Sequence, residues 1–367
     1  MTVAALGFLS SALPYVLAAL GFAVLIILHE LGHFTVAKRV GMRVERFLLF
    51  FPPILTKVKR GETEYGIGAI PLGGYVKITG MNPEEKLPPE IAHRGYYHQP
   101  VWKRIVVIGA GPAVNIVLAF VMLFFLAFGA REVTRNVGEV SAGSPAAKVL
   151  ESGDRILTVD GRGGDQVALS RRISTHHCAG RQVPGCLART PVLLRVERDG
   201  KVVALRVKPR YDHVRKRTLI GFRFGTRDIN PGPVEAARLS GQLMWDVTSG
   251  TVSAIARIFE PQQRKQISGV VGSYEVTREA FTFDARRALT LLAVISLSLG
   301  VINLFPFLPL DGGHIFWSLV EKVRGRPVPF RVMEQAGVIG FMLVIFLAAI
   351  GLSNDIGRLT GEGFNTR

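Results

Sequence analysis

Apolar residues gather in four long runs, two on each side of a polar middle. The runs cover roughly residues 9–28, 106–130, 288–310 and 337–352, and a helix needs about 20 apolar residues to cross a hydrocarbon core. No basic segment precedes the first run and no small-residue cleavage site follows it, so we expect a retained helix and not a signal peptide. The pattern predicts a polytopic α-helical membrane protein with about four transmembrane helices.

The polar middle of the chain carries a different pattern. Two short apolar alternations, 192–196 and 202–207, flank the pair Asp199-Gly200, which is typical of a tight β-hairpin. We therefore expect a small inserted β-rich domain, followed by amphipathic helices along the membrane surface. The expected regions are an N-terminal membrane region 1–132, the β-rich domain 133–212, an external amphipathic segment 213–287 and a C-terminal membrane region 288–367.

The basic residues indicate the orientation of the chain in the membrane. The net charge is +17, but the basic residues flank apolar runs and form no single basic-aromatic stripe, so we expect binding to lipid headgroups and not to nucleic acid. Residues 35–60 carry seven basic side chains against one acid, and the loop before the fourth run is also basic. The positive-inside rule then places both segments in the cytoplasm, and both termini and the β-rich domain outside.

A metal-binding motif follows the first apolar run. The residues His29-Glu30-Leu31-Gly32-His33 form an H-E-x-x-H pattern, which on a helix places both imidazoles on one face. Zinc is the metal that suits two imidazole ligands, and Glu30 between them could accept a proton from water. Ionisable groups at membrane depth are costly unless they have a function, so we expect a zinc site at this position.

The third zinc ligand must come from elsewhere in the chain, because catalytic zinc usually has three protein ligands. Pro306 and Pro309 interrupt the third run, and Asp311 follows them. We expect the zinc motif at the C-terminal end of the first helix and Asp311 at the C-terminal end of the third. These two helices run in the same direction, so Asp311 would meet the two histidines on the cytoplasmic side. His314 is a rival ligand or a partner of the ligands.

At this point the sequence resembles the site-2 protease family of intramembrane zinc metalloproteases, most closely its RseP-like bacterial branch. The resemblance rests on the H-E-x-x-H motif and on Asn303, Pro306 and Leu310-Asp311-Gly312. It implies that His29, His33 and Asp311 bind Zn²⁺, that Glu30 is the catalytic base, and that Asn303 helps to hold the substrate or the developing oxyanion. A structural cap at the helix break is the other role open to Asn303. It also implies a multi-pass protein of the bacterial cytoplasmic (inner) membrane, with its active site toward the cytoplasm.

The same resemblance implies the substrates and two further structural elements. Family members perform regulated intramembrane proteolysis of single-span membrane proteins, such as anti-sigma factors or signal-peptide remnants. Residues 73–77 resemble the family's membrane-associated β-hairpin, and 137–161 resemble a PDZ domain, of which this chain has room for one. A PDZ-like domain implies a peptide ligand. Gly111 and Asn115 match a family stretch that we interpret as mainly structural, with Asn115 a secondary site candidate.

Two other functional hypotheses and one chemical question stay open at the level of sequence. A non-catalytic PDZ membrane scaffold would not need an intact metal motif, and a metal transporter would show repeated helix pairs, which we do not find. Cys178 and Cys186 could form a disulfide if the domain faces an oxidising compartment, or could be free thiols. A second metal site with His176 and His177 fits no standard zinc spacing.

Overall fold

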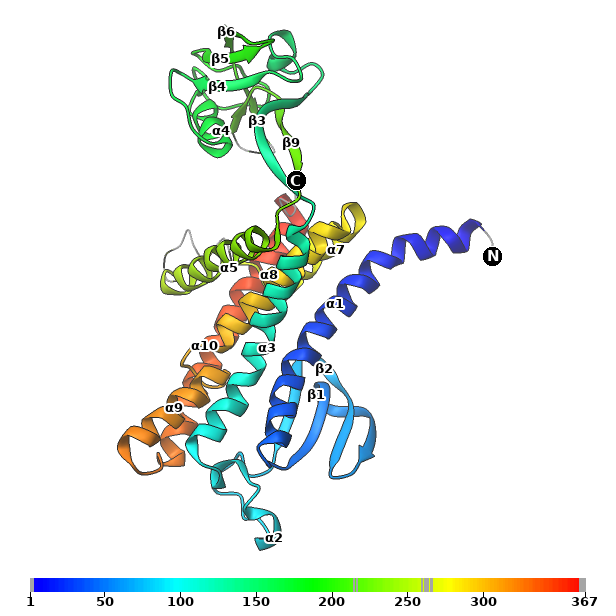
Figure 1. Cartoon of the computed structure of the whole chain (residues 1–367), viewed down its shortest axis with the longest axis vertical. Helices are drawn as coiled ribbons and strands as arrows, with labels where there is room; N and C mark the ends of the chain where they lie inside the picture. Colours follow the sequence, from blue (N-terminus) through cyan, green and yellow to red (C-terminus); the bar gives the residue numbers. More distant parts are fainter. Residues whose placement is uncertain are drawn as a thin grey trace. The chain divides into compact units, whose positions relative to one another are not determined.

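The computed structural model describes residues 3–213, 215, 217–258, 260, 264 and 267–362. The chain forms two units, one made of residues 1–127 and 233–367 and the other of residues 128–232. The first unit carries the apolar helices and the second carries most of the β-strands (Figure 1). Gln266, in the expected external segment 213–287, lies outside the described residues.

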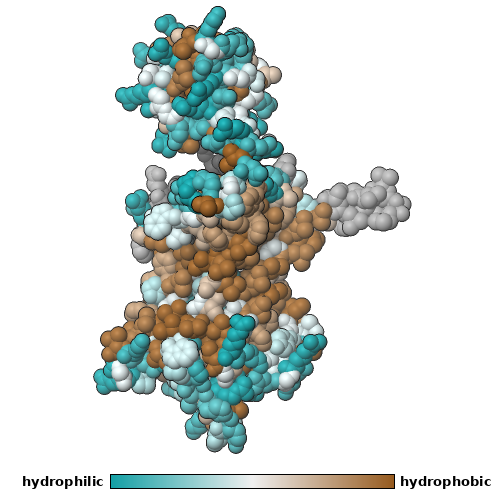
Figure 2. Space-filling view, viewed as in Figure 1, coloured by the Kyte–Doolittle hydropathy of each residue, from teal (hydrophilic) through white to brown (hydrophobic). Residues whose placement is uncertain are grey.

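Four helices of the first unit are long and apolar enough to cross a membrane, counting only the described residues. They are α1 (Val3–Arg39), α3 (Val101–Ala127), α8 (Ala285–Asn303) and α10 (Phe330–Gly357). Figure 2 shows apolar surface gathered over the middle of this unit, with polar surface at the end that carries the hairpin and α2. The predicted polytopic helical architecture is confirmed.

Shorter elements complete the first unit. They are the strands β1 (Val44–Arg60) and β2 (Thr63–Ile78), the helices α2 (Pro89–Ala92), α5 (Pro233–Ala256), α7 (Val270–Phe283) and α9 (Asp311–Arg324), the 3-10 turn η1 (Tyr96–His98) and the π-helical turn η3 (Arg358–Glu362). Asp355 of α10 is fully buried and accepts hydrogen bonds from the backbone N–H groups of Gly269 and Gly272 at the start of α7. A carboxylate stabilises a helix N-terminus, so α10 fixes the position of α7.

Two helix boundaries differ from the prediction in ways that affect the site. The zinc motif does not end α1, since the helix continues from His29 to Arg39 and buries Ala37 against the hairpin. The helix stops before Gly41, whose positive φ is typical of a helix C-terminus. Asp311 does not end the third membrane helix either. That helix ends at Asn303, because Pro306 and Pro309 interrupt the hydrogen-bond ladder, and Asp311 begins α9.

The strands β1 and β2 bend into a small sheet beside the second half of α1 (Figure 1). The first part of β1, residues 44–49, pairs with the end of β2, where Leu49 lies opposite Gly74 and Leu48 opposite Tyr75. On its other flank, Leu48 also lies opposite Gly66. Residues 44–49 therefore lie inside the sheet, while residues 74–78 have one described neighbouring strand and form an edge.

The second unit is a five-stranded sheet with the strand order β6-β5-β4-β3-β9. Its elements are β3 (Ala130–Val140), η2 (Pro145–Lys148), β4 (Arg155–Val159), α4 (Gln166–Ser174), β5 (Val192–Arg198), β6 (Lys201–Val207), β7 (Arg210–Asp212), β8 (Arg217–Leu219) and β9 (Phe222–Ile229). The hairpin predicted at Asp199-Gly200 joins β5 and β6, and both residues have positive φ. The sheet continues past residue 212, because β9 pairs along β3.

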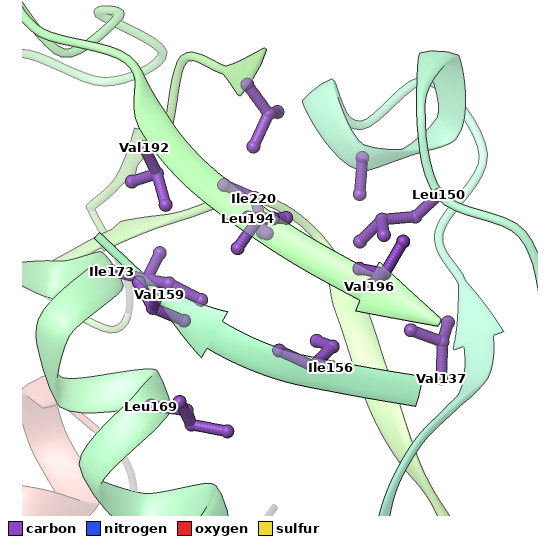
Figure 3. Close-up of a cluster of buried hydrophobic side chains, with 12 residues drawn as sticks. Val137, Leu150, Ile156, Val159, Leu169, Ile173, Val192, Leu194, Val196 and Ile220 are labelled. Carbon is purple, nitrogen blue, oxygen red and sulfur yellow. The ribbon is translucent and has the colours of Figure 1, made fainter. Parts of the chain in front are cut away.

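One apolar cluster forms the core of the second unit. Alternate residues of β5 point into it and are fully buried, as Val192, Leu194 and Val196 show, and Leu169 and Ile173 of α4 cover it (Figure 3). The alternation follows from the two-residue period of a strand with one face packed. The unit therefore has its own hydrophobic core, as expected of an inserted PDZ-like domain.

Candidate metal centre

Helix α1 brings the two motif histidines to the interior of the first unit. His29 and His33 are four residues apart, so they lie on one face of α1, and each is only 7% exposed. Asp311 reaches the same point from the first turn of α9. A helix N-terminus favours negative charge, which helps to hold this carboxylate in its ionised form next to apolar surroundings.

The ligand atoms of these three residues converge. The Nε2 atoms of His29 and His33 are 3.2 Å apart, and Asp311 Oδ2 lies 3.2 Å from the first and 3.4 Å from the second. In the part of the chain that the structure describes, they are the one group of three His, Cys, Asp or Glu side chains close enough to hold a metal ion. The sequence placed them 282 residues apart at most, and the fold brings them together.

The surroundings of the three side chains fit a zinc ion. The Nδ1–H of His33 donates to the carbonyl of Val107 at 2.9 Å, which leaves its Nε2 lone pair for a metal. Asp311 Oδ2 is buried and receives no hydrogen bond despite its short distances to both rings. A buried carboxylate oxygen without a partner is costly, and two imidazole nitrogens with one carboxylate oxygen are donors that zinc prefers.

Glu30 lies next to this group and against the β-sheet. A Cβ added at Gly74 of β2 would lie 2.1 Å from Glu30 Cγ and 2.9 Å from Glu30 Oε1. The backbone of the edge strand therefore passes the glutamate at a distance that only glycine allows. This contact places Glu30 between the three candidate ligands and the sheet edge.

Helix α3 supplies the contacts that the sequence did not reveal. Val107, Gly111 and Asn115 follow one another at four-residue spacing and are all buried on one face of α3. Val107 accepts the hydrogen bond from His33, and a Cβ at Gly111 would lie 2.2 Å from His33 Nε2. The only sequence signal was the spacing of Gly111 and Asn115, which we interpreted as helix packing.

Three other candidate residues have distinct positions. Asn303 is half-buried at the last position of α8, and among the described residues no hydrogen bond joins it to the three ligands. Asn115 is fully buried, and neither atom of its amide has a partner among the described residues. His314 is half-buried one turn after Asp311 and does not belong to the converging group.

The two cysteines lie in the second unit, apart from the candidate metal centre. Cys178 and Cys186 form a disulfide. His176 donates through Nε2–H to Asp160 Oδ2 at 2.9 Å, and its Nδ1 lies 2.8 Å from the Thr190 hydroxyl. The Gln182 amide donates to His177 Nδ1. Because both sulfur atoms are bonded to each other and His176 is held by protein partners, this cluster does not form a second metal site.

Comparison with known proteins gives a consistent result over nearly the whole chain. The model of peptidase family M50 matches residues 17–347. A protein of Brucella suis biovar 1 is 32% identical over 364 residues, which cover 91% of this chain and 92% of the relative. One of Clostridium acetobutylicum is 30% identical and covers 93% of this chain and 96% of the relative. The names of both assign them a predicted zinc metalloprotease activity.

Proposed function

Because the chain belongs to peptidase family M50, whose members are zinc-dependent peptidases of the site-2 protease type, we propose that it hydrolyses peptide bonds within the transmembrane segments of single-span membrane proteins. The observation that supports this most strongly is the burial of His29 and His33 on a helix long and apolar enough to cross a membrane. A water-using site at that depth can act on a peptide bond that soluble proteases do not reach.

The proposed zinc ligands are His29, His33 and Asp311. Bound zinc lowers the pKa of water and polarises a carbonyl group, and family M50 depends on it. The protein's own contribution is to hold the ligands in place, since Val107 fixes the tautomer and the orientation of His33. Two neutral imidazoles and one carboxylate would together supply a single negative charge to a divalent ion held by these residues.

Glu30 is the proposed general base. It is half-buried beside the ligands, so it can take a proton from the attacking water and return it to the leaving nitrogen. Gly74 supports the proposal, because the backbone of β2 closes over Glu30 and limits the positions that its carboxylate can take.

The edge of the small sheet is the proposed docking site for the unwound substrate. Residues 74–78 form an edge strand next to Glu30, and an extended peptide can add to such an edge by β-augmentation. A helical substrate shields its carbonyl groups in its own hydrogen bonds, so pairing with the edge would also compensate for unwinding. We assign Asn303 the role of holding the substrate carbonyl, since the break after α8 leaves its amide half-buried near the start of the turn to Asp311.

The proposed location is the bacterial cytoplasmic membrane, with the site toward the cytoplasm and the termini and the second unit outside. The basic residues of 35–60 support this orientation. So does the disulfide between Cys178 and Cys186, because such bonds persist in oxidising compartments outside the cytosol. The PDZ-like domain, 133–212, would then bind an extended peptide outside the membrane and admit substrates shortened by an earlier cut, as regulated intramembrane proteolysis requires.

The decisive experiment compares wild type with Glu30→Gln in detergent, using a tagged single-span substrate and a zinc assay on the same samples. We expect wild type to cut inside the apolar segment and the variant to keep its zinc and not cut. Cleavage by the Glu30→Gln variant at the wild-type rate would refute the assigned role of Glu30. Wild type without zinc would refute the assigned ligands, and cuts only outside the apolar segment would refute intramembrane cleavage.

A further inference from the structure

An apolar groove runs between α1 and α3, lined on α1 by residues that flank the two histidines in sequence but lie on a neighbouring face of the helix. Its volume is about 530 Å³, within the range of about 300–1,000 Å³ that is common for ligand sites. Its lining is apolar except for Thr35 and Arg39, and includes small residues such as Gly32, Ala110 and Ala113. Both helices are long and apolar enough to cross a membrane, so the apolar lining lies along two candidate membrane spans.

The single charged residue of the groove lies at one end. Arg39 is the last residue of α1 and is exposed. The neighbouring cations all have an acid partner: Lys38 pairs with Glu62, Arg43 with Glu45 and Arg46 with Glu64. Among the described residues Arg39 has none. Among the four cations of residues 38–46, its guanidinium is therefore the one left for an external anion.

A second cation and an aromatic ring lie at the same end. The ammonium of Lys103 donates to the carbonyl of Val40, the residue after Arg39, at 3.0 Å. Its other described acceptor is the neutral Gln99, so Lys103 also lacks an acid partner in the described chain. Trp102 is 57% exposed, and Lys103 lies 5.9 Å from its ring centre. Tryptophan at a helix end is typical of the headgroup level of a bilayer.

We propose that this groove binds one anionic phospholipid, with an acyl chain along α1 and α3 and the phosphate between Arg39 and Lys103. A basic pocket that caps an apolar cleft between membrane helices is the arrangement that recognises anionic headgroups. Charge complementarity selects this occupant over a zwitterionic lipid, whose own cation would lie near the two side chains. A substrate helix would fill the apolar part but would leave both cations without an anion.

The position of the groove connects the lipid with the zinc ligands. Its floor is the contact of Gly32 with Ala110, where an added Cβ would lie 2.6 Å from the Ala110 carbonyl oxygen. The next residue on each helix makes the corresponding contact on the other face, His33 with Gly111. The bound lipid and the His33 ring thus pack on opposite sides of the contact between α1 and α3. A bound lipid stabilises the spacing of α1 and α3 and, with it, the position of the His33 ring.

Native mass spectrometry of the delipidated full chain tests the proposal. The protein is titrated with phosphatidylglycerol or with phosphatidylcholine of the same acyl chains, and bound lipids are counted. We expect one phosphatidylglycerol molecule to bind at least about tenfold more tightly than phosphatidylcholine. Arg39→Gln should reduce this preference about fivefold, and Arg39→Gln with Lys103→Gln should abolish it. Arg60→Gln, which removes an exposed cation from the hairpin, is the matched control and should keep it.

A second pair of variants tests the groove itself. Ala113→Leu fills the groove at an exposed position, whereas Val117→Leu adds a methylene one turn further along α3, outside the lining. We expect the first variant to lose the tight lipid and the second to keep it, both with normal thermal unfolding. Equal binding of both lipids to wild type, or equal effects of Arg39→Gln and Arg60→Gln, would overturn the proposal. So would displacement of the lipid by a single-span substrate peptide, which would make the groove a substrate path.

Discussion

Arg104 on α3 and Glu321 on α9 form a bidentate ion pair, in which Nη1 donates to Oε2 at 2.9 Å and Nη2 donates to Oε1 at 2.6 Å. Arg104 is only 2% exposed, and its guanidinium also lies over the ring of Tyr97 at 5.3 Å. The pair ties α9, which begins with Asp311, to the helix whose Val107 carbonyl holds His33. One helix therefore fixes the position of candidate ligands from both of its neighbours.

Breaking this pair should loosen the candidate zinc site as well as the fold. We expect Arg104→Ala to lower the free energy of unfolding by about 3 kcal/mol, because it leaves the largely buried Glu321 carboxylate without its partner. Zinc content should fall with it, since α9 can then shift relative to α3. The measurements are thermal unfolding in detergent and metal analysis of the folded protein.

A double variant and a surface pair serve as controls for this prediction. Arg104→Met with Glu321→Met removes both charges and should recover much of the stability. Arg238→Ala breaks a fully exposed pair with Glu235 on α5 and should change neither readout. Normal zinc content in Arg104→Ala would show that the ion pair does not position Asp311.

Two glycine variants should separate metal binding from proton transfer. Gly111→Ala would place a methyl group 2.2 Å from His33 Nε2, so zinc affinity should fall at least roughly tenfold. Gly74→Ala would place one 2.1 Å from Glu30 Cγ, so the variant should keep its zinc and lose about a hundredfold in rate. Zinc competition with a chelator and cleavage of a single-span substrate measure the two effects.

Gly109 provides the matched control for the glycine variants. It lies on the same helix as Gly111, but an added Cβ would meet its nearest described neighbour, Ile315, only at 3.9 Å. Gly109→Ala should therefore leave zinc affinity and rate unchanged. If it behaves like Gly111→Ala, helix packing in general and not the contact with His33 controls the metal site.

The turn that joins β1 and β2 should become mobile in acid. Hydrogen bonds from Arg94 and Lys38 lower the pKa of Glu62 from 4.5 to about 2. Because the pKa is lowered, the ion pairs of Glu62 with Arg94 and Lys38 contribute their full stability above pH 4.5. This contribution is lost as the pH falls toward 2. In wild type, cleavage of residues 50–65 by an acid protease should rise across that interval, after correction with an unfolded substrate.

Glu62→Gln isolates the contribution of this carboxylate. The variant should be cut readily at every pH in the interval, because a neutral glutamine cannot form the ion pairs with Arg94 and Lys38. The same dependence on pH in both proteins would assign the change to other groups.

The disulfide provides a test of orientation. With Cys178 and Cys186 bonded, a membrane-impermeant maleimide should not label intact cells. After reduction with an impermeant reductant, both thiols should be labelled from outside, and a Cys178→Ser, Cys186→Ser variant should not. Labelling only after the cells are opened would place the second unit on the inner side.

The sequence predicted those features that depend on local periodicity. The four apolar runs became membrane-length helices, and the Asp199-Gly200 pair became a hairpin, because run length and turn chemistry are local properties. The spacing of His29 and His33 also predicts one helical face, whatever the rest of the chain does.

The positions where the helices end, and the residues that contact His33 and Glu30, depend on tertiary contacts. A local sequence pattern does not predict such contacts. The extension of α1 beyond His33 follows from burial of Ala37 against a sheet that lies later in the chain. The contacts of Gly111 with His33 and of Gly74 with Glu30 join separate elements, so each glycine looked like an ordinary packing or turn residue. Asp311 lies beside the motif histidines as the first residue of α9, whereas the sequence pattern led us to place it at the end of the preceding helix.

The second unit is joined to the rest of the chain through neighbouring strands. Its first strand, β3, and its last strand, β9, lie side by side, with Ala130 opposite Ile229. The chain therefore enters and leaves the unit at almost the same point, so the whole insertion could be replaced by a tight turn without stretching the flanking backbone. Such a geometry lets a lineage gain, lose or duplicate the inserted module in a single genetic event, while the helical peptidase unit stays intact.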